Sequence, residues 1–112
     1  MSTLFGKIIR REIPADIVYE DELCLAFRDI NPQAPVHVLL IPKKEIPRLT
    51  DAQHGDQALL GHLMLAAVKV AKSLGVEDAF RVAINNGAEA GQSVFHVHLH
   101  LLAGRKFRWP PG

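Results

Sequence analysis

His96, His98 and His100 alternate with aliphatic residues within residues 94–102. Successive side chains of a β-strand point to opposite faces of the sheet, so this alternation predicts a strand over 94–102. The three imidazoles are expected on one face and the aliphatic side chains in the core. Three of the six histidines of the chain therefore gather on a surface that is available for chemistry.

A row of three imidazoles is suited to reactions at a phosphorus centre. A neutral imidazole is a competent nucleophile, and histidine forms covalent intermediates in catalysis. Because its pKa lies near neutrality, it also holds or releases a proton under ordinary conditions. The middle residue, His98, can attack while its neighbours hold phosphate oxygens. The preceding Gly91, Gln92 and Ser93 offer backbone N–H groups and a hydroxyl, and such backbone concavities bind anions.

A metal site is the competing interpretation of the three histidines. Residues two apart on a strand are separated by about 6.6 Å, so His96 and His100 would stand about 13 Å apart. A zinc ion needs its ligand nitrogens about 2 Å away, and one ion cannot be held by all three. Residues 94–102 contain no Cys, Asp or Glu to complete a set. We therefore expect neither a metal nor another cofactor. A row of solvated histidines without function is the remaining alternative.

Length and composition indicate one domain over residues 1–112. The net charge of +1 does not predict a nucleic-acid surface, which would show clustered Lys and Arg. The single cysteine, Cys24, is interpreted as a small buried apolar residue. His54 and His62 are interpreted as ordinary, partly exposed histidines. Neither a signal peptide nor an apolar run of about 20 residues is apparent, so we expect a cytoplasmic protein without membrane contact.

The elements that must position the histidines follow from local patterns. Alternation and prolines predict strands, while an apolar stripe at helical spacing predicts the one long helix, which Thr50 or Asp51 caps. Mostly strands, one long helix and then strands favour an α+β fold with an antiparallel sheet over an alternating βαβ fold. The predicted order is a short helix or turn at 4–10, strands at 16–21, 23–29 and 36–41, the helix at 51–74, and strands at 80–85 and 94–102.

The sequence resembles the histidine-triad (HIT) superfamily, and in particular its Hint branch of nucleotide-binding proteins. The motif over residues 96–102 carries the resemblance to the superfamily. Segments 4–9, 29–35, 41–44 and 109–112 are similar to the Hint branch, so the likeness covers nearly the whole chain. The resemblance implies a five-stranded antiparallel sheet with one long and one short helix. It also implies a homodimer whose sheets join, with the C-terminal tail near the partner's site.

The activity that the resemblance implies is hydrolysis of the P–N bond of purine nucleoside 5′-phosphoramidates. His98 would attack the α-phosphorus and become a nucleotidyl-histidine, from which water releases the nucleoside monophosphate. His100 and His96 would orient the phosphate oxygens and the ring of His98. Ser93 would assist the leaving amine, and His37 would support the triad from a neighbouring strand.

The same resemblance implies a set of nucleotide-binding residues. Asp29 would accept hydrogen bonds from the ribose hydroxyls, and this is chemically sensible for a carboxylate. Phe27 and Ile30 would line the base pocket, although Phe27 also suits the core. The phosphate site would include Asn85, Gly91, Gln92, Ser93, His98, Leu99 and His100.

Three other functions remain open from the residues. The chain could be a nucleotide-binding or partner-binding module whose hydrolysis is incidental, although binding alone would not require His98. It could hydrolyse diadenosine polyphosphates, although the tail over residues 109–112 favours the Hint branch. It could be a zinc-binding regulatory protein, against which the strand spacing argues.

Overall fold

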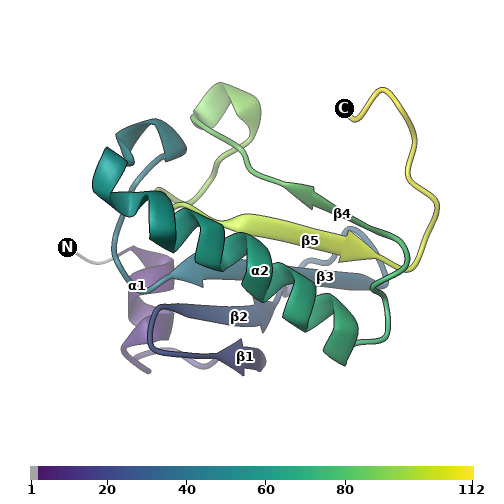
Figure 1. The fold of residues 1–112 in the computed structure, drawn as a ribbon, viewed down its shortest axis with the longest axis horizontal. Helices are drawn as coiled ribbons and strands as arrows, with labels where there is room; N and C mark the ends of the chain where they lie inside the picture. Colours follow the sequence, from purple (N-terminus) through teal and green to yellow (C-terminus); the bar gives the residue numbers. More distant parts are fainter. Residues whose placement is uncertain (1–2) are drawn as a thin grey trace.

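The computed structural model describes residues 3–112, which contain one five-stranded antiparallel sheet (Figure 1). The order of strands across the sheet is β1-β2-β3-β5-β4. This architecture confirms the predicted α+β fold. The strands are β1 (Ile17–Glu20), β2 (Cys24–Arg28), β3 (Val36–Pro42), β4 (Phe80–Ala83) and β5 (Leu99–Ala103).

The two α-helices cover opposite faces of the sheet (Figure 1). The long helix α2 (Gln57–Ser73) packs on one face, where residues of β2, β3 and β5 meet its apolar stripe. The short helix α1 (Leu4–Ile9) packs on the other face against β2 and β3. In β2, for example, Cys24 faces α2 whereas Phe27 faces α1. The alternation of side chains thus separates the core from the face that carries the histidines.

The long helix begins later than the sequence predicts. Two 3₁₀ helices, at 49–51 and 54–56, occupy the start of the region 51–74 in which one helix is expected. The helix α2 starts only after them. The cause is that two carboxylates cap separate turns. Asp51 accepts the backbone N–H of Arg48 at 3.0 Å, and Asp56 accepts that of Gln53 at 2.8 Å. Aspartate favours such local caps over a helix interior.

The last strand is also shorter than predicted. Residues 94–98 were expected to lie in it, but β5 starts at Leu99. The backbone N–H of Val97 donates to the carbonyl of Ile46 at 2.6 Å, in the segment after β3. That bond turns the chain away from the sheet ladder, so His96 and His98 precede the strand and only His100 lies in it. The prediction of three imidazoles on one regular strand face was therefore wrong.

The loop between β2 and β3 is held by the far end of β5. Gly104 has φ +94°, and a Cβ there would lie 2.8 Å from Cβ of Pro35. A side chain at this position is excluded by both conformation and space. Arg105 donates from Nε to the carbonyl oxygen of Gln33 at 3.1 Å. None of the helices within residues 3–112 is long and apolar enough to cross a membrane.

Candidate active site

A cleft of about 250 Å³ opens between α1 and the sheet, on the face opposite α2. Its apolar lining includes Phe5, Ile8 and Leu39, and its polar lining includes side chains of Asp29, Ser93 and the histidines. An apolar cleft with a few convergent polar groups is typical of a small-molecule site. The predicted site residues that line it are Phe27, Asp29, Ile30, Ser93, His98 and His100.

The tautomer of His98 is fixed by its own backbone neighbour. Nδ1 of His98 lies 2.8 Å from the carbonyl oxygen of His96, which can only accept, so Nδ1 carries the proton. Nε2 is then left with its lone pair. Burial lowers the pKa of His98, while the bond to the carbonyl opposes that shift. The ring also meets the edge of Phe5, with 4.9 Å between centroids. His98 is thus a neutral, immobilised imidazole.

His100 is fixed through a relay that starts at a backbone amide. The N–H of Gln33 donates to Nδ1 of His37 at 3.0 Å, so the proton of His37 is on Nε2. That Nε2 lies 2.9 Å from Nδ1 of His100 and donates to it. The proton of His100 is consequently on Nε2. Burial, and then the neighbouring His98 and His37, lower the pKa of His100 to about 4. His100 is a neutral hydrogen-bond donor on the cleft wall.

His96 lies behind the cleft rather than in its wall. Its Nε2 donates to the carbonyl oxygen of Pro42 at 2.7 Å, and its Nδ1 lies 3.4 Å from Oγ1 of Thr3. The ring is buried, and burial lowers its pKa. Thr3 also caps α1 by accepting the N–H of Gly6 at 3.0 Å. Since both ring nitrogens are engaged, His96 links α1 to the end of β3, and any effect on phosphate is indirect.

Asp29 stands at the end of β2 with its carboxylate in the cleft wall. One oxygen accepts the N–H of Asn31 at 2.8 Å, and the other lies 3.5 Å from Nε2 of His37. The second oxygen therefore has spare acceptor capacity toward the cleft. Ile30 is fully exposed at the rim, whereas Phe27 is buried beneath Phe5.

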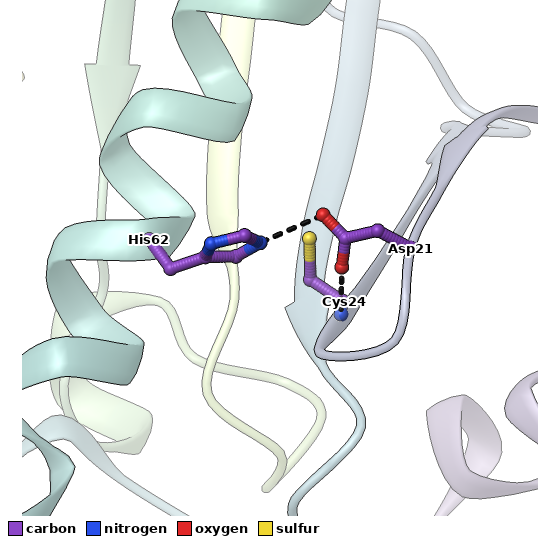
Figure 2. Close-up of side chains that lie close together, drawn as sticks. All are labelled: Asp21, Cys24 and His62. Atoms are coloured by element: carbon purple, nitrogen blue, oxygen red, sulfur yellow. Dashed lines mark hydrogen bonds and ion pairs between the residues drawn. The ribbon is translucent and has the colours of Figure 1, made fainter.

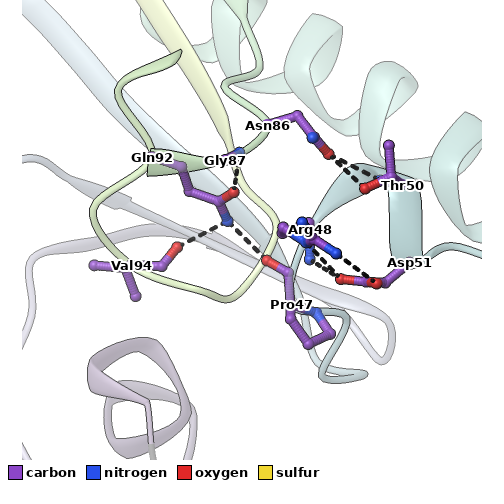
Figure 3. A network of polar contacts seen from close by, with 8 residues as sticks. All are labelled: Pro47, Arg48, Thr50, Asp51, Asn86, Gly87, Gln92 and Val94. Carbon is purple, nitrogen blue, oxygen red and sulfur yellow. Dashed lines mark hydrogen bonds and ion pairs between the residues drawn. The ribbon is translucent and has the colours of Figure 1, made fainter. Parts of the chain in front are cut away.

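Gln92 shapes the loop that leads to the triad (Figure 3). The buried side chain accepts the N–H of Gly87 at 2.8 Å and donates to the carbonyl oxygens of Pro47 and Val94, at 2.7 and 3.1 Å. Three bonds from one amide join two loops that are far apart in sequence. The structure thus places Gln92 as a brace and not in the cleft lining.

Of the remaining predicted residues, one lines the cleft and the others do not. Ser93 lines the cleft beside the histidines. Asn85 packs against Gly91, where a Cβ would lie 3.4 Å from Nδ2 of Asn85, and Gly91 has φ +100°. Leu99 is buried in the core on the α2 face and does not reach the cleft.

Three residues near the histidines were missed in the sequence. Thr3 precedes a predicted helix and is a favoured cap residue, so a capping argument could have found it. Phe5 belongs to the apolar side of that helix, and only the packing of α1 shows that it contacts His98. Gln33 acts through its backbone, for which no sequence signal exists.

Two groups of side chains among residues 3–112 have the composition and spacing of a metal site. In the cleft, donor atoms of Asp29, His37 and His100 lie within 4.8 Å of one another. Asp21, Cys24 and His62 form the other group, on the α2 side of the sheet. Neither group contains all three of His96, His98 and His100, so neither tests the expectation that these three histidines cannot share one ion.

Comparison with known proteins identifies the family. A model of the HIT domain matches residues 10–107. The chain belongs to the HIT family. It is 70% identical over 110 residues to an uncharacterized HIT-like protein of Synechocystis sp., covering 98% of this chain and 96% of the relative. It is 54% identical over 112 residues to a maize protein called 14 kDa zinc-binding protein, covering 98% and 88%.

Solved structures of this HIT family share the fold closely. A HIT family hydrolase from Legionella pneumophila superposes with a TM-score of 0.96 at 47% identity, covering 99% of this chain and all of the other. A histidine triad nucleotide-binding protein from Candida albicans gives 0.84 at 33% identity, covering 97% and 83%. The chain therefore has the fold of HIT family hydrolases.

The depressed pKa of His100 makes stability depend on pH. Histidine in an unfolded chain titrates near 6.5, whereas His100 in the folded protein titrates near 4. Between these values the unfolded chain binds more protons, so the free energy of unfolding falls as pH is lowered through this window. Urea unfolding at a series of pH values measures the slope. We expect His100→Gln to flatten it, and an unchanged slope in that variant would contradict the assignment.

Proposed function

We propose that this HIT protein hydrolyses the P–N bond of purine nucleoside 5′-phosphoramidates through a covalent nucleotidyl intermediate on His98. The observation that carries the proposal is the pair of opposite tautomers in the cleft. His98 presents an unprotonated Nε2, while His100 beside it presents Nε2–H. Their ring centroids are 4.9 Å apart. A nucleophile and a neutral donor at that distance suit a tetrahedral phosphorus and its oxygens.

In the first step Nε2 of His98 forms a bond to the α-phosphorus and the P–N bond breaks. The amine leaves with a proton, which the Ser93 hydroxyl on the cleft wall relays from solvent. The ring of His98 becomes cationic, and the carbonyl of His96 that accepts from Nδ1 stabilises this charge. His100 donates from Nε2 to a phosphate oxygen.

In the second step water attacks the phosphorus and the N–P bond to His98 breaks. Nε2 regains its lone pair, the proton of the water is released, and the nucleoside monophosphate leaves. His98 returns to the Nδ1–H tautomer without any change of partner at Nδ1. His37 keeps His100 in its tautomer throughout, because the Gln33 amide can only donate. His100 thus acts as a positioned neutral ring, and His98 is cationic only while it carries the nucleotidyl group.

The nucleotide is placed by the remaining cleft residues. The base would lie against Phe27 and Ile30 on the apolar side, and Asp29 would accept from the ribose hydroxyls. The phosphate then comes to His98, His100 and Ser93. Asn85, Gly91 and Gln92 would act by shaping the loop before Ser93. A binding module with incidental hydrolysis would need the same cleft but not the tautomer of His98.

The proposed mechanism makes a prediction about the nucleophile. We expect His98→Ala or His98→Asn to abolish turnover of adenosine 5′-phosphoramidate while AMP binding is largely retained. The reason is that loss of a covalent nucleophile removes the chemical step rather than ground-state binding. Steady-state assays and calorimetric titration of AMP measure the two effects. The exposed His54 lies outside the cleft, and His54→Ala is the control. Wild-type turnover in purified His98→Ala would refute the mechanism.

The proposed placement of the nucleotide makes a prediction about the sugar. Asp29→Ala should weaken AMP binding about ten- to a hundredfold, since charge-assisted hydrogen bonds contribute about 1.5–3 kcal/mol. The preference for AMP over 2′-deoxy-AMP should shrink in parallel. Calorimetric titration of both nucleotides measures it. Asp78→Ala is a matched control, because Asp78 is exposed and lies outside the cleft lining. Unchanged discrimination in Asp29→Ala would mean that the carboxylate serves only the turn at Asn31.

Zinc binding in the cleft is a second candidate function, favoured by the spacing of Asp29, His37 and His100 and by the name of the maize relative. Because Asp29 and His100 would also hold the nucleotide, we predict that zinc inhibits and does not activate. Protein treated exhaustively with chelator should keep full phosphoramidase activity, and added Zn²⁺ should compete with AMP. Metal content is measured on the same sample. Activity that disappears with the metal and returns with zinc would favour a metal enzyme.

We also propose a homodimer in which the β4 strands of two copies pair and extend the sheet. Two observations support it: β4 forms an edge of the sheet in residues 3–112, and α2 exposes Met64, Leu65 and Val68 on one side. Trp109 in the tail is also 80% exposed. Apolar side chains gathered on a surface commonly mark an interface.

The proposed dimer predicts that a charged side chain on the exposed apolar face of α2 will prevent association. Leu65→Glu should convert the protein to a monomer, because the carboxylate would be buried without a partner. Sedimentation at several concentrations measures the mass. Leu23→Glu places the same charge at an exposed leucine in the β1–β2 turn and should leave the dimer intact. A monomeric wild type, or a dimeric Leu65→Glu, would contradict this interface.

A further inference from the structure

Asp21, Cys24 and His62 converge on the α2 side of the sheet, opposite the cleft (Figure 2). They come from three separate places: the turn between β1 and β2, the first residue of β2, and the first half of α2. One donor atom from each lies within 4.8 Å of the other two. None of them lines the cleft, so the proposed hydrolysis does not use them.

The contacts of Asp21 leave one of its oxygens directed at this cluster. Oδ1 accepts the backbone N–H groups of Leu23 and Cys24, at 2.8 and 2.9 Å, and so holds the turn. Oδ2 accepts the hydroxyl of Tyr19 and Nε2 of His62, each at 2.7 Å. An ion at Oδ2 would therefore leave the turn bonds of Oδ1 in place.

We propose that Asp21, Cys24 and His62 form a zinc site that joins α2 to the β1–β2 turn. A carboxylate oxygen, a thiolate sulfur and an imidazole nitrogen are all zinc ligands, and water would complete a tetrahedron. Neighbouring ligands of such a tetrahedron lie about 3.3–3.8 Å apart. The distance between Oδ2 of Asp21 and Nε2 of His62 would have to increase slightly, and the sulfur of Cys24 would have to move toward the ion. Oxygen-only cations are disfavoured, because the sulfur is a soft ligand.

Exposure at the site gives the ion a path of entry. The side chains of His62 and Asp21 are 31% and 25% exposed, whereas Cys24 is fully buried beneath them. An ion can therefore reach the imidazole and the carboxylate from solvent before it meets the sulfur. The sulfur ligand is thus buried, as in a structural zinc site, while the other two ligands are accessible to solvent.

Binding must displace one proton. Burial raises the pKa of the Cys24 thiol to about 12, with Asp21 acting in the same direction. The thiol proton is released when the Zn–S bond forms, and the proton on Nε2 of His62 moves to Nδ1 as Nε2 binds the ion. The charge of the ion meets the carboxylate and the new thiolate, so the buried site ends neutral. Metal affinity is coupled to ligand deprotonation in this way in proteins generally.

Cobalt(II) is the probe, since it replaces zinc and a thiolate bound to it gives a charge-transfer absorption in the near ultraviolet. Cys24 is the single cysteine of the chain, so this band reports Cys24 alone and is blind to the Asp29 group in the cleft. We expect the band in the wild type with added Co²⁺. It should disappear in Cys24→Ala and when Zn²⁺ is added in excess.

His62→Gln separates the proposed site from simple binding at a thiol. The change is at a partly exposed position, so folding should be preserved, and loss of a ligand should weaken Co²⁺ binding by at least about tenfold. His54→Gln is the matched control and should bind as the wild type does. Zinc should raise the melting temperature of the wild type more than that of Cys24→Ala.

Two results would overturn the site: no thiolate band in the wild type, or wild-type cobalt affinity in His62→Gln. Turnover of adenosine 5′-phosphoramidate by Cys24→Ala and His62→Gln is expected to be unchanged. The proposed hydrolysis and the zinc site can therefore fail independently of each other.

Discussion

The register between β3 and β5 is the constraint on which the rest of the site depends. Leu39 pairs with His100 and His37 with Leu102, so His37 and His100 share a face as diagonal neighbours. Side chains alternate between faces along a strand, and a slip of one residue would turn His100 toward α2. The relay from Gln33 through His37 would then end in the core. The packing of Val38 and Leu101 against α2 fixes the register that the chemistry needs.

In the free protein the histidine site is a buried polar network of neutral rings. Every buried side-chain nitrogen and oxygen in residues 3–112 has a hydrogen-bond partner. Each of the four rings has a distinct partner: a backbone carbonyl for His96 and His98, a backbone amide for His37, and His37 for His100. Neutral rings avoid the large cost of buried charge, and fixed partners prevent tautomer exchange. Most of the order in the site thus comes from backbone groups.

The sequence predicted the elements well because their signals are local. Alternation and prolines located all five strands, and the helical stripe located α2. The errors arose where a distant group replaced a local bond. Val97 donates to Ile46 instead of the sheet, which shortens β5, and Asp56 caps a turn before α2. The sequence predicted no metal site at Cys24 and His62, because no local pattern shows that a side chain of α2 will reach the turn that contains Asp21.

The dependence of His100 on Gln33 limits which substitutions the relay can accept. The donor that starts the relay is a main-chain N–H, which nineteen of the twenty amino acids supply whatever their side chain. The side chain of Gln33 donates separately to the carbonyl oxygen of Asn31 at 3.0 Å, and its loss would leave the relay in place. Proline alone lacks the hydrogen. The relay itself therefore forbids only proline at position 33, although the residue there helps to set the protonation of the site.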